Sequence, residues 1–195
     1  MERGHKFDPS RVDALAARDR LEELDPTRLL HAAALQERTA ALSSIVDLGA
    51  GPGLIARALS ALVPDATLYA FDVEPSMMEH LQRELTAEEA QRILPRQSGE
   101  SRIDLDDDAV DFLLMVDVYH ELHDAAAVLG EARRVLRPGG TVLVVDWARG
   151  GTEGGPPDDH RVPVEVLEEE MRGAGFAEVA RSELFAQHHA VRGRS

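Results

Sequence analysis

The fold is decided by the stretch Ser44-Ile45-Val46-Asp47-Leu48-Gly49-Ala50-Gly51-Pro52-Gly53-Leu54. An apolar run of strand length leads straight into three alternating glycines, and a helix-compatible segment follows. Glycine lets the backbone turn sharply and lets a ligand approach closely, and the first N–H groups of a helix have no partner inside it. The stretch therefore favours a strand, a ligand-binding loop and a helix N-terminus over a plain tight turn.

The glycine spacing indicates which ligand this loop fits. A dinucleotide fingerprint would place its third glycine at position 54, where Leu54 stands. Asp72 follows the next apolar run, about 20 residues after Gly53, where an acid can accept both hydroxyls of a ribose. Its alternative role is a cap for the helix that follows. Together, the loop and the acid predict a nucleoside ligand other than NAD.

Strand-length and helix-length segments alternate along most of the chain. The predicted strands are residues 44–48, 67–71, 93–97, 110–116 and 141–145, and the predicted helices are 53–63, 75–90 and 124–136. Continuous apolar strands that alternate with helices indicate a parallel sheet covered on both faces. A helix over 163–172 and a strand pair over 177–185 and 187–192 complete the series. These segments predict an α/β, Rossmann-like, doubly wound, seven-stranded sheet that is mostly parallel and has an antiparallel C-terminal edge hairpin.

Residues 10–42 read as helical, with a new helix starting at Asp25-Pro26, because Asp caps well and Pro fits the first helical position. We predict that residues 1–42 form a lid segment across the ligand. Residues 43–195 then form one globular unit that binds it.

Composition excludes several classes of function. The chain has 195 residues, 21 Lys plus Arg, 36 Asp plus Glu, a net charge of −15 and no cysteine. Disulfides, thiolate metal sites and cysteine nucleophiles are therefore excluded. The acidic balance disfavours nucleic acid as a partner, and no apolar run approaches the roughly 18 residues that span a bilayer. We expect a cytoplasmic monomer or homodimer without membrane attachment.

The motifs resemble those of the class I S-adenosylmethionine-dependent methyltransferases. Residues 46–53 look like the first motif of that family, residues 70–72 like the second, and residues 110–116 and 136–140 like the fourth strand and the turn before the fifth. The resemblance covers about residues 43–190. Its nearest branch includes the ubiquinone/menaquinone C-methyltransferases and small bacterial enzymes. It implies a methyltransferase that uses S-adenosylmethionine and acts on a small-molecule acceptor.

Carried over residue by residue, the resemblance implies a set of cofactor-binding positions. They are Asp47, Gly49, Ala50, Gly51, Gly53, Asp72, Val73, Ser98, Gly99, Glu100 and Asp117. One position departs from the pattern. Many relatives carry an Asp for the adenine amino group where this chain has Gly99, so either Ser98 or Glu100 supplies that contact or it is missing.

The loop after the fourth predicted strand carries the candidate catalytic residues. Histidine titrates near neutrality, so His120 is the candidate general base; the alternative is that it only caps or hydrogen-bonds nearby backbone. Tyr119 is the candidate for orienting the acceptor through its hydroxyl. Asp117 contacts the methionine part of the cofactor or shapes the turn.

Three further residues are candidates for substrate contact. Trp147 follows the fifth strand and either stacks on a substrate or covers the sheet edge. His160 and Arg161 close over the site, with Arg161 recognising an anion, or lie on the solvated surface. His188 and His189 are adjacent on a strand and point to opposite faces, so they cannot share a metal, and we predict no metal site.

Two other functions stay open at this point. Leu54 at the third-glycine position argues against an NAD-dependent oxidoreductase. A non-catalytic module that binds S-adenosylmethionine is the other alternative, because Gly99 replaces the usual acid.

Overall fold

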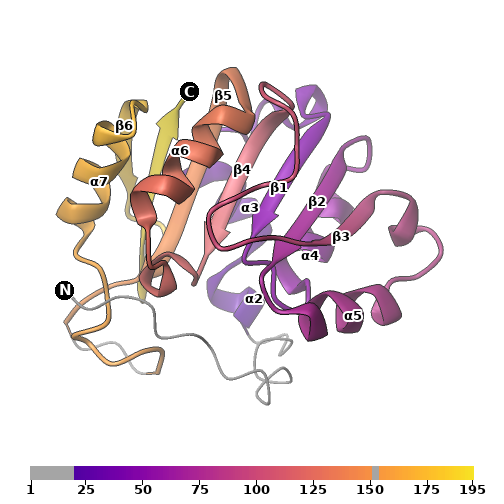
Figure 1. Cartoon of the computed structure of the whole chain (residues 1–195), viewed down its shortest axis with the longest axis horizontal. Coiled ribbons are helices and arrows are strands. Elements are labelled where there is room, and N and C mark those ends of the chain that lie inside the picture. Colours follow the sequence, from indigo (N-terminus) through magenta and orange to yellow (C-terminus); the bar gives the residue numbers. More distant parts are fainter. Residues whose placement is uncertain (1–19, 151–153) are drawn as a thin grey trace.

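The computed structural model describes residues 20–150 and 154–195, and within them seven strands form one sheet (Figure 1). The strand order is β3-β2-β1-β4-β5-β7-β6, and neighbouring strands are parallel except for the antiparallel pairs β5–β7 and β7–β6. The strands are β1 (Ser44–Leu48), β2 (Thr67–Asp72), β3 (Ile93–Gln97), β4 (Val110–Val116), β5 (Leu136–Trp147), β6 (Ala177–Ser182) and β7 (His188–Arg194). The predicted doubly wound sheet with its antiparallel C-terminal edge is confirmed.

Helices cover both faces of the sheet because its central strands are apolar on both. Ile45 and Val46 are neighbours on β1, so they point to opposite faces, and both are fully buried. Ile45 shares a buried cluster with residues of α3, α4 and α5, and Val46 shares one with residues of α6 and α7. These two groups of helices cover opposite faces of the sheet (Figure 1). The helices are α2 (Arg20–Glu23), α3 (Pro26–Ala32), α4 (Leu54–Leu62), α5 (Pro75–Glu84), α6 (Ala125–Val135) and α7 (Val164–Gly173). The strand order reverses between β1 and β4, where ligands of such sheets bind beyond the carboxyl ends.

The two largest differences between the predicted and the observed boundaries after residue 43 concern β5 and α5. β5 begins at Leu136 rather than at residue 141: residues 136–140, predicted as a turn, belong to the strand, which has φ 75° at Gly139 and a register shift against the start of β4. α5 ends at Glu84 rather than at residue 90. Beyond it, Thr86 and Glu89 bond reciprocally, each side chain accepting from the other's backbone N–H, and the chain continues into the separate turn η3 (Glu89–Gln91).

The described part of the N-terminal segment belongs to the main core. Asp25 accepts a hydrogen bond from the N–H of Arg28 at 3.0 Å and Pro26 opens α3, as predicted. The prediction of helix over residues 10–42 is wrong beyond Ala32, since the backbone at Ala34 turns to φ 56°, and residues 1–19 lie outside the described part. The apolar side chains of this segment join the cluster around Ile45: Leu24, Leu29, Leu30, Ala32, Ala33, Leu35 and Leu42.

In the ranges that the structure describes, none of the helices has both the length and the apolar character that crossing a bilayer requires.

We expect Gly53→Ala to destabilise the fold and Gly130→Ala to stabilise it. Gly53 has φ +85°, and a Cβ atom there would lie 2.3 Å from Leu81 on α5, so the substitution should cost about 1–3 kcal/mol. Gly130 lies inside α6 with open space around its Cβ position, so alanine should add about 0.5–1 kcal/mol. Urea unfolding of both variants measures the change in the free energy of unfolding. A Gly53→Ala variant as stable as the wild type would contradict the packing described.

Candidate functional site

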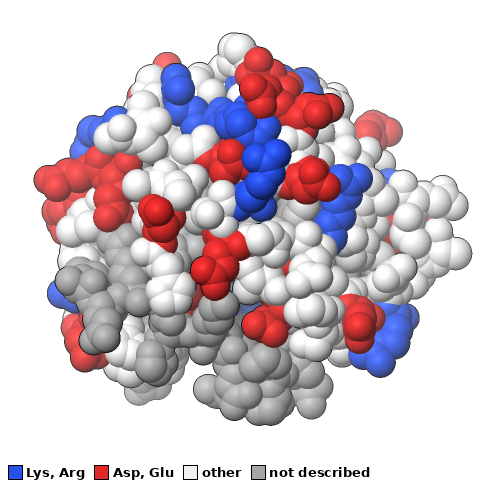
Figure 2. Space-filling model, viewed as in Figure 1, with Lys and Arg blue, Asp and Glu red and all other residues white. Residues whose placement is uncertain are grey.

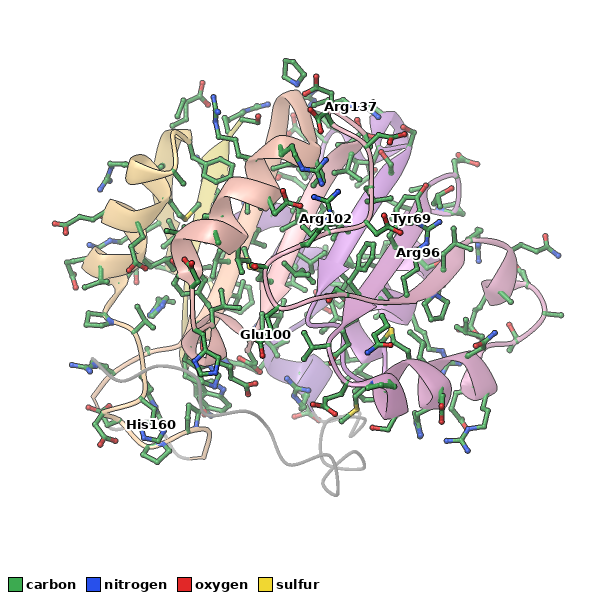
Figure 3. All side chains as sticks on the ribbon, viewed as in Figure 1. Tyr69, Arg96, Glu100, Arg102, Arg137 and His160 are labelled. Atoms are coloured by element: carbon green, nitrogen blue, oxygen red, sulfur yellow. The ribbon has the colours of Figure 1, made fainter. Side chains whose placement is uncertain are left out.

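A cavity of about 1030 Å³, counted to its open mouth, lies across the carboxyl ends of β3, β2, β1 and β4. Ten of the eleven residues predicted to bind a cofactor line it: Asp47, Gly49, Ala50, Gly51, Asp72, Val73, Ser98, Gly99, Glu100 and Asp117. Figure 3 shows Glu100 toward this end of the sheet and Arg137 at the opposite end. Segments that are far apart in the sequence therefore meet at one edge, as parallel strands require.

The loop after β1 is tied to its neighbours on both sides. The backbone N–H groups of Gly49 and Ala50 both donate to the carbonyl of Phe71 at the end of β2, at 2.8 and 2.9 Å. On the other side, a Cβ atom at Gly49 would lie 2.6 Å from Val118 in the loop after β4, and Gly49 has φ +79°. Only glycine lets the two loops approach this closely.

Asp47 carries a buried carboxyl at the end of β1. It is 2% exposed, and the backbone N–H of Ala56 in the first turn of α4 favours its charged form. Its second oxygen, Oδ2, is buried without a hydrogen-bond partner. Burial, together with the charge of Asp72, raises the pKa of Asp47 to about 7. An unsatisfied buried acceptor on the cavity wall fits a ligand that brings a donor or a positive charge.

Asp72 is held rigidly at the end of β2. Its Oδ2 accepts the N–H of Gly51 at 2.8 Å, and its Oδ1 accepts the N–H of Glu74 at 2.9 Å. Burial raises the pKa of Asp72, partly offset by these bonds. Glu74 precedes α5 and is its N-cap residue, so the carboxylate of Asp72 does not bond to the first turn of that helix. The alternative role as a helix cap therefore does not describe its contacts.

The β4 end of the cavity carries a network of charged side chains. Asp117, whose backbone has φ 57°, forms ion pairs with Arg20 at 2.6 Å and with Nε2 of His188 at 3.0 Å. Nδ1 of His188 lies 3.5 Å from Glu23 on α2. Burial opposes ionisation of Asp117, but His188 and Arg20 outweigh it and lower its pKa. Sequence reasoning missed Arg20, because no motif surrounds it.

His120 lies beside the cavity in the turn η4 (Tyr119–Glu121) and is held by Asp146 at the end of β5. Asp146 accepts both the backbone N–H and Nδ1 of His120, each at 2.7 Å. This leaves Nε2, which lies 3.7 Å from the carboxylate of Glu121, a residue of the cavity wall. Burial would lower the pKa of His120, but the bond to Asp146 and the nearby carboxylates raise it.

None of the predicted catalytic and substrate residues, His120 included, is part of the cavity wall. Tyr119 is fully buried and donates its hydroxyl to Glu170 on α7 at 2.7 Å. Arg161 is 4% exposed and donates to the carbonyls of residues 148, 154 and 156, so it organises its own loop. Its guanidinium lies 5.5 Å from the ring centre of Trp147.

Trp147 also packs against His188, with ring centres 4.4 Å apart. His160 lies in the same loop as Arg161, away from the cavity wall (Figure 3). On β7, His188 pairs with Trp147 and His189 pairs with Asp146. Because adjacent residues of a strand point to opposite faces, His188 and His189 face opposite sides of the sheet. Within residues 20–150 and 154–195, no three His, Cys, Asp or Glu side chains are grouped to hold a metal ion.

Comparison with known proteins identifies the family of this domain. Residues 46–144, just over half of the chain, match the family described as "Methyltransferase domain". The chain is 26% identical over 156 residues to a malonyl-[acyl-carrier protein] O-methyltransferase of Hahella chejuensis, covering 74% of this chain and 54% of that protein. It is 29% identical over 148 residues to an uncharacterized 37.1 kDa protein in a transposon of Streptomyces fradiae, covering 74% and 42%. The chain thus spans about half the length of these curated relatives.

Solved structures share the fold. A SAM-dependent methyltransferase from Aquifex aeolicus superimposes with a TM-score of 0.86 at 26% identity, over 97% of this chain and 99% of that one. Human N-acetylserotonin methyltransferase in complex with SAM gives a TM-score of 0.75 at 18% identity, over 96% and 55%. With this family match and this fold, the chain belongs to the methyltransferase domain family and is a class I, S-adenosylmethionine-dependent member.

Proposed function

We propose that this chain transfers the methyl group of S-adenosylmethionine to a small-molecule acceptor. The observation that carries the proposal is the single cavity in which the glycine loop, the buried carboxyl of Asp47 and the fixed carboxylate of Asp72 meet. When bound, the cofactor supplies an electrophilic methyl group on a positively charged sulfur. A cavity wall with an unsatisfied buried acceptor suits that charge.

The strand order suggests how the cofactor is oriented. Asp72 ends β2, in the middle of the cavity, and would accept the ribose hydroxyls. On one side, beyond β3, Ser98, Gly99 and Glu100 border the space for the adenine. A Cβ atom at Gly99 would meet nothing within 4 Å, so an adenine contact there would have to come from Ser98 or Glu100. On the other side, β4 offers Asp117 to the methionine part.

Charge supports a small acceptor rather than a nucleic acid. The chain carries a net charge of −15, and a polyphosphate would be repelled by it. On the face shown in Figure 2, basic side chains form short groups with acidic ones between them rather than one continuous basic surface. The described cavity wall is itself rich in carboxylates.

His120 is the residue that we assign as general base. Asp146 fixes its Nδ1, so the proton-accepting atom would be Nε2, toward Glu121. A base at this position implies an acceptor that loses a proton as it is methylated, such as a hydroxyl, an amine or an activated carbon. Burial and the neighbouring loops would exclude water and align the acceptor with the methyl group.

The test is to incubate the protein with methyl-labelled S-adenosylmethionine and a cell extract that is then separated into small molecules, nucleic acids and proteins. We expect label in the small-molecule fraction. His120→Gln should lower transfer by about a hundredfold or more while S-adenosylhomocysteine still binds. Label in RNA or protein, or undiminished transfer by His120→Gln, would contradict the proposal.

The pH profile separates a base from a structural histidine in the same assay. Because the pKa of His120 is raised, transfer should increase with pH as the imidazole loses its proton. Asp146→Asn removes the partner that holds the proton, so the rise should move to lower pH. A profile that keeps its position in Asp146→Asn would show that the pair only fastens the loop.

Asp47 should link cofactor affinity and stability to pH in opposite directions. Its pKa in the folded protein is about 7, against an ordinary value of 3.8, so the buried carboxyl destabilises the fold increasingly as pH rises from about 4 to 7. Asp47→Asn should remove this cost and stabilise the ligand-free protein by on the order of 2 kcal/mol at pH 8. Chemical unfolding at pH 5 and pH 8 measures the difference.

Binding should follow the ionised carboxyl. Affinity for S-adenosylmethionine should rise between pH 6 and pH 8 in the wild type and change less in Asp47→Asn, because the cationic cofactor favours the charged form. Identical pH dependence in the two proteins would show that Asp47 does not meet the ligand's charge.

A further inference from the structure

Helix α2 borders the cavity and is fastened mainly by charged contacts. Arg20, its first residue, lines the cavity, and α2 lies at the lower end of the sheet in Figure 1, where the parallel strands end. None of its four residues is buried, and Leu21 packs only partly against the core. α2 therefore lacks the buried side chains that anchor α3 to α7.

Four side chains of alternating charge join α2 to the sheet, and we call them the clasp: Arg20, Asp117, His188 and Glu23. Arg20 reaches one oxygen of Asp117 at 2.6 Å, and Nε2 of His188 lies 3.0 Å from the other. Nδ1 of His188 lies 3.5 Å from Glu23, which also accepts the backbone N–H of Gln187 at 2.8 Å. The series begins and ends on α2, so the clasp holds the helix at both its first and its last residue.

His188 is the member of the clasp whose charge can change near neutral pH. It is 6% exposed and lies on β7, behind the cavity wall rather than on it. The charged groups that face it are Glu23 from α2 and Asp117 from the loop after β4. From β5, the ring of Trp147 packs against it, and the guanidinium of Arg161 lies beyond that ring. Burial would lower the pKa of His188, but the two carboxylates raise it. Loss of the proton leaves both carboxylates without the cation between them.

We infer that His188 is a positioning residue whose protonated imidazole closes the clasp and holds α2 across the β4 end of the cavity, and whose deprotonation lets α2 open. It acts through Glu23 and Asp117 and does not itself touch the ligand. Because the pKa of His188 is raised above its ordinary value of 6.5, the clasp is fully closed below that pH and weakens as pH rises through the raised pKa. The inference rests on the proposed function, because the ligand that α2 retains is taken to be the cofactor and its product.

The ring of Trp147 supplies a direct readout of His188. It is the only tryptophan of the chain, and its ring centre lies 4.4 Å from that of His188. A protonated imidazole against an indole quenches its fluorescence, so the emission of the ligand-free full chain should increase as His188 loses its proton. Glu23→Gln should move this increase to lower pH, because it removes one of the two carboxylates that raise the pKa. His188→Gln should abolish the increase.

The rate at which S-adenosylhomocysteine dissociates from the full chain, measured by surface plasmon resonance, tests whether the clasp retains the ligand. At about pH 6, Glu23→Gln should release it about tenfold faster than the wild type, whereas at about pH 9 the two should release it at equal rates. Glutamine keeps an acceptor for the N–H of Gln187, so the substitution removes only the charge. Glu22→Gln makes the same change at an exposed position of α2, and this matched control should behave as the wild type. Any pH effect of Asp47 is common to the three proteins and cancels when they are compared at one pH.

Three results would overturn the inference while leaving the proposed function intact. The first is an equal rate in the wild type and Glu23→Gln at about pH 6, which would show that the clasp does not retain the ligand. The second is a rate difference of the same size at both pH values, which would show a fixed contact that does not follow His188. The third is an emission increase that persists in His188→Gln. If the wild type binds no S-adenosylhomocysteine, the proposed function fails, and this inference fails with it.

Discussion

The ligand edge of this protein depends on how closely two loops approach each other at Gly49. The loop after β1 carries Asp47 on one side of that contact, and the loop after β4 carries Asp117 on the other. With a Cβ atom at Gly49 only 2.6 Å from Val118, any other residue would push the loops apart and change the spacing of the acids along the wall. The glycine pattern is therefore a condition of the cavity's shape as well as of the turn.

The carboxyls of the cavity are arranged for binding at some expense in stability. The pKa values of Asp47 and Asp72 are raised, mainly because burial disfavours their charged forms. Asp117 is also largely buried, with its side chain 9% exposed, but its pKa is lowered, because His188 and Arg20 supply positive charge. A cationic ligand would favour the charged form of Asp47 and lower its pKa, as His188 and Arg20 do for Asp117. Apparent stability should thus rise when the cofactor binds.

Local patterns in the sequence were enough to predict the fold and most of the cofactor-binding positions that line the cavity. β1, β3 and β4 have the predicted bounds. For β1 and β4 the reason is a largely apolar run between turn residues, which has few other solutions, and the topology then brings the predicted loops together. Sequence reasoning failed where distant contacts decide. Tyr119 and Arg161 look reactive in the sequence, but Glu170 and three backbone carbonyls engage them. Arg20 and Asp146 matter through partners about 100 and 26 residues away, which no short motif records.

The central claim is that the cavity holds the cofactor with its ribose on Asp72. The most direct test is calorimetric titration of the protein with S-adenosylhomocysteine and, separately, with NAD, repeated with Asp72→Ala. We predict micromolar binding of S-adenosylhomocysteine that is lost or strongly weakened in Asp72→Ala, and no heat from NAD. Binding of NAD alone, or S-adenosylhomocysteine binding that is unchanged in Asp72→Ala, would contradict the account.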